Sequence, residues 1–113
     1  MDRRALGASG EEAAAEWYSA HGYAVVARNW RCREGELDLV LRRGATYVFC
    51  EVKARTSDAF GAPVEAVGRE KQARVRRLAA RWLSEAAPRP AAEVRFDVAS
   101  VLDGTVSILE AAF

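Results

Sequence analysis

The sequence has little of what zinc and thiol chemistry require. Its 113 residues include two cysteines, Cys32 and Cys50, and a single histidine, His21. Two isolated cysteines build neither a disulfide framework nor a Cys-x-x-Cys metal site, and one histidine argues against a zinc site or a Ser-His triad. A metal bound here would have to be a hard cation held by the oxygens of Asp and Glu.

Long apolar runs and an excess of charge are also missing. No stretch approaches the roughly 20 apolar residues that cross a bilayer, and the opening residues, MDRRALGASGEE, lack the apolar segment of a signal peptide. The formal net charge is +1, so attraction to nucleic acid has to come from a local patch. We therefore expect a cytoplasmic protein without a membrane partner.

The spacing of polar and apolar residues predicts one α/β domain over residues 1–113. Ser9 and Glu12 have the spacing of a capping box before an Ala-rich run, which favours a first helix. Three strand-like segments follow and predict an antiparallel meander. A second helix, which Gly68 can split, precedes two last strands, so the order αβββαββ predicts a mixed five-stranded sheet flanked by helices. The predicted helices cover about 10–20 and 64–87, and the predicted strands 23–30, 36–42, 47–55, 94–101 and 105–109, with a turn-rich connection at 56–63.

Charged residues interrupt two otherwise apolar strands. In YVFCEVKAR, residues 47–55, Glu51 and Lys53 point to the same face because side chains alternate along a strand. In ELDLVLR, residues 36–42, the interruption is Asp38. A hairpin loop of two or four residues puts Asp38 on the face of Glu51, and a three-residue loop separates them. Two carboxylates brought together repel, and a cation, a proton or a neighbouring lysine relieves the repulsion.

Three helical residues are placed to look toward the same sheet. Lys71 and Gln72 fall on the side of the second helix that carries its apolar stripe, Val75 to Ala86. Glu11 lies on the inner side of the first helix. Each feature alone also fits an ordinary surface: a solvated ion pair for Glu51, a polar helix end for Lys71, and a charge that complements the helix dipole for Glu11.

Asp38, twelve intervening residues and Glu51-x-Lys53, after a helix with an inward acid, resemble the PD-(D/E)XK nuclease signature. The segments GASGEEAA, ARNWRCREGELDLV, VFCEVKAR, FGAPVEAV, EKQARV, RFDV and the final AAF are similar to the YraN family, small bacterial proteins assigned to a restriction-endonuclease-like fold and similar to Holliday-junction resolvases. The resemblance runs from about Gly7 to Phe113. It departs at Cys50, where valine is common, and at Glu110, where another polar residue is usual.

The resemblance implies a single PD-(D/E)XK nuclease-like domain that breaks phosphodiester bonds with Mg²⁺ or Mn²⁺. Its implied ligands are Asp38, Glu51 and the Val52 carbonyl, and Lys53 would position or deprotonate the attacking water. The family pattern also contains Asp97, for which we expect a structural hydrogen bond. The remaining implied catalytic residues are Glu11, acting on the metal through water or on a second ion, and Lys71 and Gln72, orienting phosphate or Glu51.

Arginines supply the predicted contacts to nucleic acid. Phosphate contacts give affinity without sequence readout, so we expect recognition of branched, flapped or single-stranded DNA, with Trp30 or Phe60 available to stack on a base. A homodimer would suit a two-fold junction. The alternative is a non-catalytic nucleic-acid-binding or adaptor protein that retains the nuclease fold. The predicted DNA-binding residues are Arg28, Arg31, Arg33, Arg69, Arg74, Arg76, Arg77 and Arg81.

Overall fold

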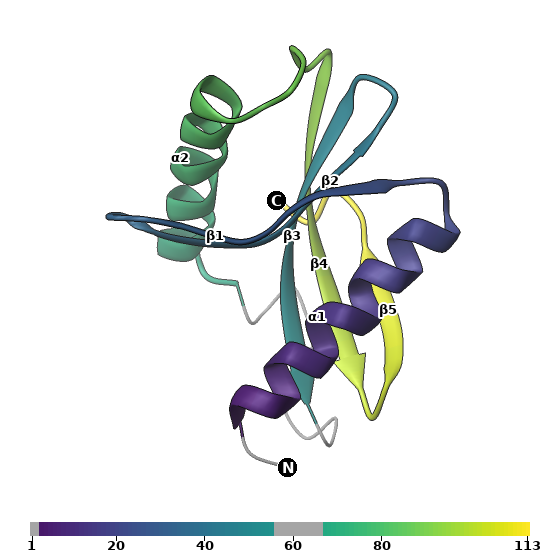
Figure 1. Ribbon diagram of the computed structural model, residues 1–113. Coiled ribbons are helices and arrows are strands. Elements are labelled where there is room, and N and C mark those ends of the chain that lie inside the picture. The colour runs from purple at the N-terminus through teal and green to yellow at the C-terminus, as the bar shows by residue number, and fades with distance from the viewer. Residues whose placement is uncertain (1–2, 56–66) are drawn as a thin grey trace.

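One mixed sheet with a helix on each side forms the scaffold. The computed structural model describes residues 3–55 and 67–113, so the predicted turn at 56–63 and its Phe60 lie outside the described residues. The elements are α1 (Arg3–Ala20), β1 (Ala24–Cys32), β2 (Gly35–Arg43), β3 (Thr46–Arg55), α2 (Arg69–Glu85), β4 (Glu93–Leu102) and β5 (Thr105–Leu109). The predicted order αβββαββ is confirmed, and the strands lie side by side as β1-β2-β3-β4-β5 (Figure 1).

Both helices differ from the prediction at their N-terminal ends. α1 begins at Arg3 rather than near Gly10, so Ser9 lies inside the helix and the capping-box interpretation was wrong. The residues just before Ser9 include alanine and leucine, which favour continued helix. α2 begins directly after Gly68, an extended N-cap residue. Neither described helix has an apolar stretch long enough to cross a membrane.

The turn between β2 and β3 sets which side chains share a face. β1, β2 and β3 form the predicted antiparallel meander, and β4 joins β3 in parallel after α2. The β2–β3 turn has two residues, the first being Gly44 with φ 62°, a left-handed conformation that glycine adopts without strain. Leu39 and Cys50 form the last pair of this ladder, and Asp38 and Glu51 come next on their strands. The parity that brings these two acids together is therefore confirmed.

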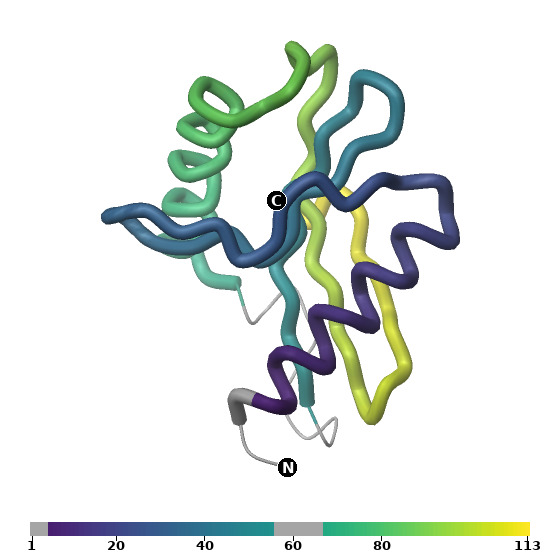
Figure 2. Tube along the Cα trace, in the orientation of Figure 1, coloured from purple at the N-terminus to yellow at the C-terminus, as the bar shows by residue number. Residues whose placement is uncertain are grey.

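The two faces of the sheet pack against different helices (Figures 1 and 2). In β3, Cys50 belongs to the core under α1, as expected for core packing, whereas Phe49 packs edge-on against Trp82 of α2. Glu51 and Lys53 have the parity of Phe49 and therefore lie on the α2 side. The α1-side core contains Ala14, Ala15, Tyr18, Tyr23, Leu39, Leu41, Val48, Cys50 and Ala99, and the α2-side core contains Leu37, Val40, Tyr47, Phe49, Val75, Leu78, Ala79 and Trp82.

Asp97 joins α1, β4 and the residues that follow β5. It is fully buried. The Tyr18 hydroxyl donates to its Oδ2 at 2.6 Å, and the Arg95 guanidinium donates to both of its oxygens at 2.9 Å. The Ala111 N–H donates to its Oδ1 at 3.0 Å. Burial raises the pKa of the Tyr18 hydroxyl, which keeps it a donor. The structural hydrogen-bonding role expected for Asp97 is confirmed.

Gly10 allows α1 to approach the back of β3. A Cβ atom built at Gly10 would lie 2.6 Å from the Ala54 Cβ and 3.7 Å from the Val52 Cγ1. Such a separation is far below ordinary contact, and Ala54 has no flexible end that could move aside. By contrast, Gly7 in the same helix has nothing within 4 Å of the equivalent position.

We therefore expect Gly10→Ala and Gly7→Ala to change stability in opposite directions. Gly7→Ala should stabilise the protein by about 0.5–1 kcal/mol, because alanine favours helix over glycine. Gly10→Ala gains the same propensity but must push α1 from the sheet, an overpacking cost of about 1–3 kcal/mol, so a net loss is expected. Urea unfolding of both variants measures the difference. Equal stabilisation by the two substitutions would contradict the close approach at Gly10.

Candidate functional site

Three polar side chains stand in a row across β1, β2 and β3. Asn29 and Asp38 lie between the paired residues Arg28–Leu39 and Trp30–Leu37, and Asp38 and Glu51 follow directly on the last β2–β3 pair, Leu39–Cys50. The charge of Asp38 acts on Glu51, so the two carboxylates are close enough to interact. The two carboxylates predicted as metal ligands are therefore neighbours.

Glu51 is a buried carboxyl with one oxygen left without a partner. Its side chain is 2% exposed, and its Oε1 lies 3.3 Å from the Lys71 Nζ. Its Oε2 has no hydrogen-bond partner in the described part of the chain. Burial, followed by the charge of Asp38, raises the pKa of Glu51 from 4.5 to about 7, with Lys71 acting in the opposite direction. This environment favours a proton or a cation at Glu51.

Asp38 is held by the strand that carries Glu51. The Val52 N–H donates to the Asp38 Oδ2 at 2.9 Å. Burial raises the pKa of Asp38, while the Val52 hydrogen bond and the charge of Lys71 oppose that rise. Because one oxygen is fixed by the backbone of β3, the carboxylate keeps a defined orientation beside Glu51.

Lys53 and Lys71 come from different elements and meet beside the two carboxylates. Each side chain shifts the pKa of the other, and two ammonium groups so placed repel. Burial, and then the contact with Lys71, lowers the pKa of Lys53. Burial also acts to lower the pKa of Lys71, but the charge of Glu51 and the neighbouring hydrogen bonds outweigh it and raise that pKa. Lys71 therefore keeps its proton as the partner of Glu51, and Lys53 gives up a proton more readily.

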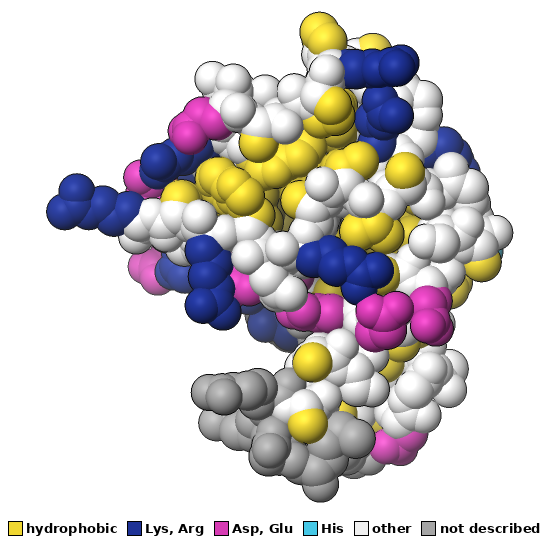
Figure 3. Space-filling view, in the orientation of Figure 1, with side chains coloured by type: hydrophobic (Ala, Val, Ile, Leu, Met, Phe, Trp, Pro, Cys, Tyr) yellow, Lys and Arg dark blue, Asp and Glu magenta, His cyan; other side chains and the backbone are white. Residues whose placement is uncertain are grey.

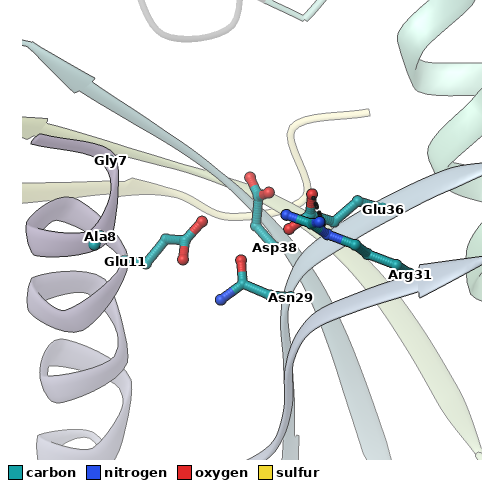
Figure 4. A pocket seen from close by; sticks show the side chains of 7 residues that line it. All are labelled: Gly7, Ala8, Glu11, Asn29, Arg31, Glu36 and Asp38. Atoms are coloured by element: carbon teal, nitrogen blue, oxygen red, sulfur yellow. Dashed lines mark ion pairs between the residues drawn. The ribbon is translucent and has the colours of Figure 1, made fainter. Parts of the chain in front are cut away.

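An open pocket of about 440 Å³ lies beside Asp38, between α1 and the β1–β2 hairpin (Figure 4). Glu11 enters it from α1, so the inward orientation predicted for this acid is confirmed. Burial raises the pKa of Glu11, a hydrogen bond with Asn29 lowers it, and the charge of Asp38 raises it. The pocket is lined by Gly7, Ala8, Glu11, Asn29, Arg31, Glu36 and Asp38.

Asn29 lines the pocket with a polar side chain and was not among the residues predicted from the sequence. Asn29 has φ 49°, a left-handed backbone that asparagine tolerates better than most residues. In a strand this conformation is unusual, and it depends on tertiary structure that the sequence does not display. The only available signal was a polar amide inside the apolar, β-rich stretch YAVVARNW.

The described hydrogen bonds of Gln72 lead away from the carboxylates. Its Nε2 donates to the Val67 carbonyl, and its backbone N–H donates to the Gly68 carbonyl, both at 2.9 Å. These bonds fix the first turn of α2, from which Lys71 extends. They give no support to the prediction that Gln72 orients Glu51.

Half of the predicted DNA-binding arginines are engaged within the protein. Arg76 lies over the rings of Phe96 and Phe113, at 5.0 and 5.5 Å from their centroids. Three others pair with glutamates, which reduces the charge that they can offer to phosphate. These pairs are Arg28 with Glu12 at 2.7 Å, Arg31 with Glu36 at 3.3 Å, and Arg81 with Glu34 at 2.8 Å and Glu85 at 2.6 Å.

The other four predicted arginines are exposed at the hairpin tip and on α2. Arg33 lies in the β1–β2 turn, and Arg69, Arg74 and Arg77 lie on α2. The hairpin and α2 adjoin, because a Cβ at Gly35 would come within 3.4 Å of the Arg74 Cδ. Lys and Arg side chains gather on this side of the molecule, at the left of Figure 3. We call these four residues the arginine surface.

The donor set at Asp38 and Glu51 fits a hard cation. Both donors are carboxylates, and one buried oxygen of Glu51 has no partner among the described residues. In residues 3–55 and 67–113, no group of three or more His, Cys, Asp or Glu side chains is arranged to hold a metal. Mg²⁺ commonly takes only one or two carboxylates from a protein and completes its octahedron with water and substrate phosphate. A pair of acids is therefore compatible with Mg²⁺ or Mn²⁺.

Comparison with known proteins finds relatives over most of the chain. Residues 10–101 match the family described as "Uncharacterised protein family UPF0102". A UPF0102 protein of Frankia alni is 60% identical over 97 residues, covering 86% of this chain and 80% of the relative. One from Beutenbergia cavernae is 61% identical over 98 residues, covering 87% and 82%. One from Acidothermus cellulolyticus is 46% identical over an alignment of 125 residues, covering 98% and 95%.

Proposed function

The chain belongs to the UPF0102 family, and we propose that it is a Mg²⁺- or Mn²⁺-dependent endonuclease acting on structured DNA. The YraN resemblance is thereby confirmed, and with it the restriction-endonuclease-like fold. The family description names no activity, so the proposal rests on the site. The observation that supports it is the buried oxygen of Glu51 beside Asp38, which has no partner within residues 3–55 and 67–113. The alternative of an exposed ion pair would leave both partners in water.

Asp38 and Glu51 would hold the metal, with the Val52 carbonyl as a third ligand. The chain fixes this arrangement through the Val52 N–H bond to Asp38 and the Lys71 contact to Glu51. A positive charge there would offset the repulsion that contributes to the raised pKa of Glu51. When bound, the ion supplies Lewis-acid activation of water and of the phosphate. Glu11 would order water from across the adjoining pocket.

Lys53 is the residue that we assign to the attacking water. A lowered pKa makes this lysine easier to deprotonate, and the neutral amine can accept a proton. In its protonated form it offsets negative charge that grows on the phosphate oxygens. Lys71 stays charged and holds the Glu51 carboxylate in place.

The arginine surface would bind the DNA backbone. Arg33, Arg69, Arg74 and Arg77 offer exposed guanidinium groups beside the site. Such contacts give salt-dependent affinity and carry no sequence information. We therefore favour recognition of DNA shape, in branched, flapped or single-stranded substrates. The homodimer stays a prediction.

The expected result of Lys53→Met is a protein that binds DNA but cuts it about 10²- to 10⁴-fold more slowly, the range for losing a general base. Asp38→Asn should lose cleavage as well, because one ligand becomes a neutral amide. Cleavage is measured on branched, flapped, single-stranded and duplex DNA and on RNA, in Mg²⁺ or Mn²⁺ and in EDTA. Asp103→Asn, in the exposed β4–β5 turn, is the matched control and should cut like wild type.

Two outcomes would contradict the nuclease proposal. Wild-type protein that binds these substrates and never cuts them would instead be a non-catalytic binding or adaptor protein. Cleavage that survives both Lys53→Met and Asp38→Asn would come from another site or from a contaminant.

A further inference from the structure

We propose that the pocket between α1 and the β1–β2 hairpin binds an unpaired nucleobase, next to the phosphate held at Asp38. The inference rests on the proposed function, because it takes the reacting phosphate to lie beside Asp38 and Glu51. A base inserted into a pocket cannot also be paired in a duplex. The favoured substrate is therefore a nucleic acid with an unpaired nucleotide adjoining the cleaved bond.

The size and walls of the pocket suit a flat ring. Its volume of about 440 Å³ lies within the range of pockets that hold small ligands. Gly7 and Ala8 form the α1 wall and carry almost no side-chain bulk. Even a Cβ added at Gly7 would meet no atom within 4 Å. The opposite wall includes Asp38, so a group in the pocket is within one nucleotide of the site (Figure 4).

The charges of the pocket exclude phosphate and match a base. Among the described residues, Arg31 and Glu36 form an ion pair at 3.3 Å and Asp38 is assigned to the metal, which leaves Glu11 as the free carboxylate of the lining. Negative groups repel a phosphate, whereas carboxylate oxygens accept hydrogen bonds from the exocyclic amino groups of bases. Asparagine offers both a donor and an acceptor to a base edge. The arginine surface would contact the phosphates on either side of the bound base.

Asn29 is held in the conformation that aims its amide into this space. Its neighbours keep regular pairing, Arg28 with Leu39 and Trp30 with Leu37, while Asn29 itself has φ 49°. Unusual backbone conformations persist where the surrounding structure enforces them, often at binding sites. The amide of Asn29 and the carboxylates of Glu11 and Asp38 converge on the same opening (Figure 4).

The test measures binding in EDTA, so that it is independent of cleavage. Three ligands of equal length are compared: single-stranded DNA, an abasic sugar-phosphate chain and duplex DNA. Single-stranded DNA should bind about tenfold more tightly than the abasic chain, a difference of about 1.4 kcal/mol. The salt dependence of the two should be the same, because they present the same phosphates. Duplex DNA has a higher phosphate density, so its affinity should depend more steeply on salt than that of either single chain.

Two variants should remove the preference for bases without removing phosphate binding. Gly7→Leu fills the pocket from a position with free space, and Asn29→Gly removes the amide while keeping a left-handed backbone accessible. Ser9→Leu is the control, since Ser9 is exposed on α1 and is not part of the lining. It should keep the full preference. Circular dichroism and thermal unfolding check that each variant is folded.

Equal affinity for single-stranded DNA and the abasic chain would overturn the inference, as would a preference that survives Gly7→Leu. Calorimetric titration with Mn²⁺ alone gives a third outcome: heat of binding that Gly7→Leu abolishes would make the pocket a cation site instead. Base-dependent binding by a protein that never cuts would refute only the nuclease proposal.

Discussion

Replacing Glu51 by glutamine is expected to stabilise the folded protein at about pH 8 and to abolish DNA cleavage. The pKa of Glu51 is about 7 in the folded protein, against an ordinary value of 4.5. The stability that this group contributes is therefore fully present below about pH 4.5 and is lost as the pH rises through about 7. The difference, 7 − 4.5 = 2.5, corresponds to about 3 kcal/mol at full ionisation.

Glutamine has the same shape and cannot ionise, so Glu51→Gln avoids this loss. The free energy of unfolding should exceed that of wild type at about pH 8 and approach it at about pH 5. Urea unfolding in EDTA measures the free energy of unfolding of both proteins at the two pH values. The same variant should show no cleavage in Mg²⁺ or Mn²⁺, because it has lost a carboxylate ligand. A stabilising change that removes activity is the signature of a functional rather than a structural acid.

Glu16→Gln is the matched control for Glu51→Gln. Glu16 is exposed on α1, so its neutralisation should leave the pH dependence of stability unchanged. Adding Mn²⁺ should raise the melting temperature of wild type and of Glu16→Gln but not of Glu51→Gln, since only a folded site with both carboxylates binds the ion. A Glu51→Gln protein that is less stable than wild type at about pH 8, or that still cuts, would contradict the argument.

Removing the Asp97 carboxylate is expected to cause the largest loss of stability. Asp97→Ala takes the acceptor from the buried Tyr18 hydroxyl and leaves the Arg95 guanidinium, whose side chain is 16% exposed, with only the Tyr23 hydroxyl and Glu110. Breaking a buried ion pair from one side costs about 3–5 kcal/mol. That is a large part of the 5–15 kcal/mol by which small domains are stable, so a strongly lowered midpoint of urea unfolding is expected.

Asp97→Asn separates charge from packing at this position, and Asp103→Asn is its control. Asp97→Asn keeps the volume and one acceptor oxygen, so it should lose less stability than Asp97→Ala. Asp103→Asn changes an exposed acid in a turn and should have almost no effect. A loss of less than about 1 kcal/mol in Asp97→Ala would show that the network around Asp97 contributes no more than a surface pair.

The sequence predicted the element order and the pairing of the two acids because both follow from local patterns. Alternation in β2 and β3 assigned Asp38 and Glu51 to faces, and the glycine at 44 agrees with the short turn that brings those faces together. Helical periodicity placed Lys71 on the side of α2 that faces the strands. Asp38, Glu51 and Lys71 lie on β2, β3 and α2, which follow one another along the chain.

What the sequence did not predict depends on contacts between distant residues. Asp97 meets Tyr18 of α1, 79 positions earlier in the chain, and no periodicity reports such a contact. Arg28 is engaged by Glu12, so a count of arginines overstates the free positive charge. Asn29 was not predicted as a site residue, because no sequence pattern indicates its left-handed φ of 49°.

The two faces of β3 have different roles, and this difference affects which substitutions the protein can accept during evolution. Cys50 and the other even-numbered residues anchor the strand to α1, and Glu51 and Lys53 on the reverse side carry the proposed chemistry. Selection for folding and selection for catalysis therefore act on alternate positions of one strand. Because Glu51 is itself destabilising when ionised, its replacement is favoured by stability alone once cleavage is no longer selected. Under the proposed nuclease function, one such substitution would give a descendant that binds DNA without cutting it and keeps the architecture.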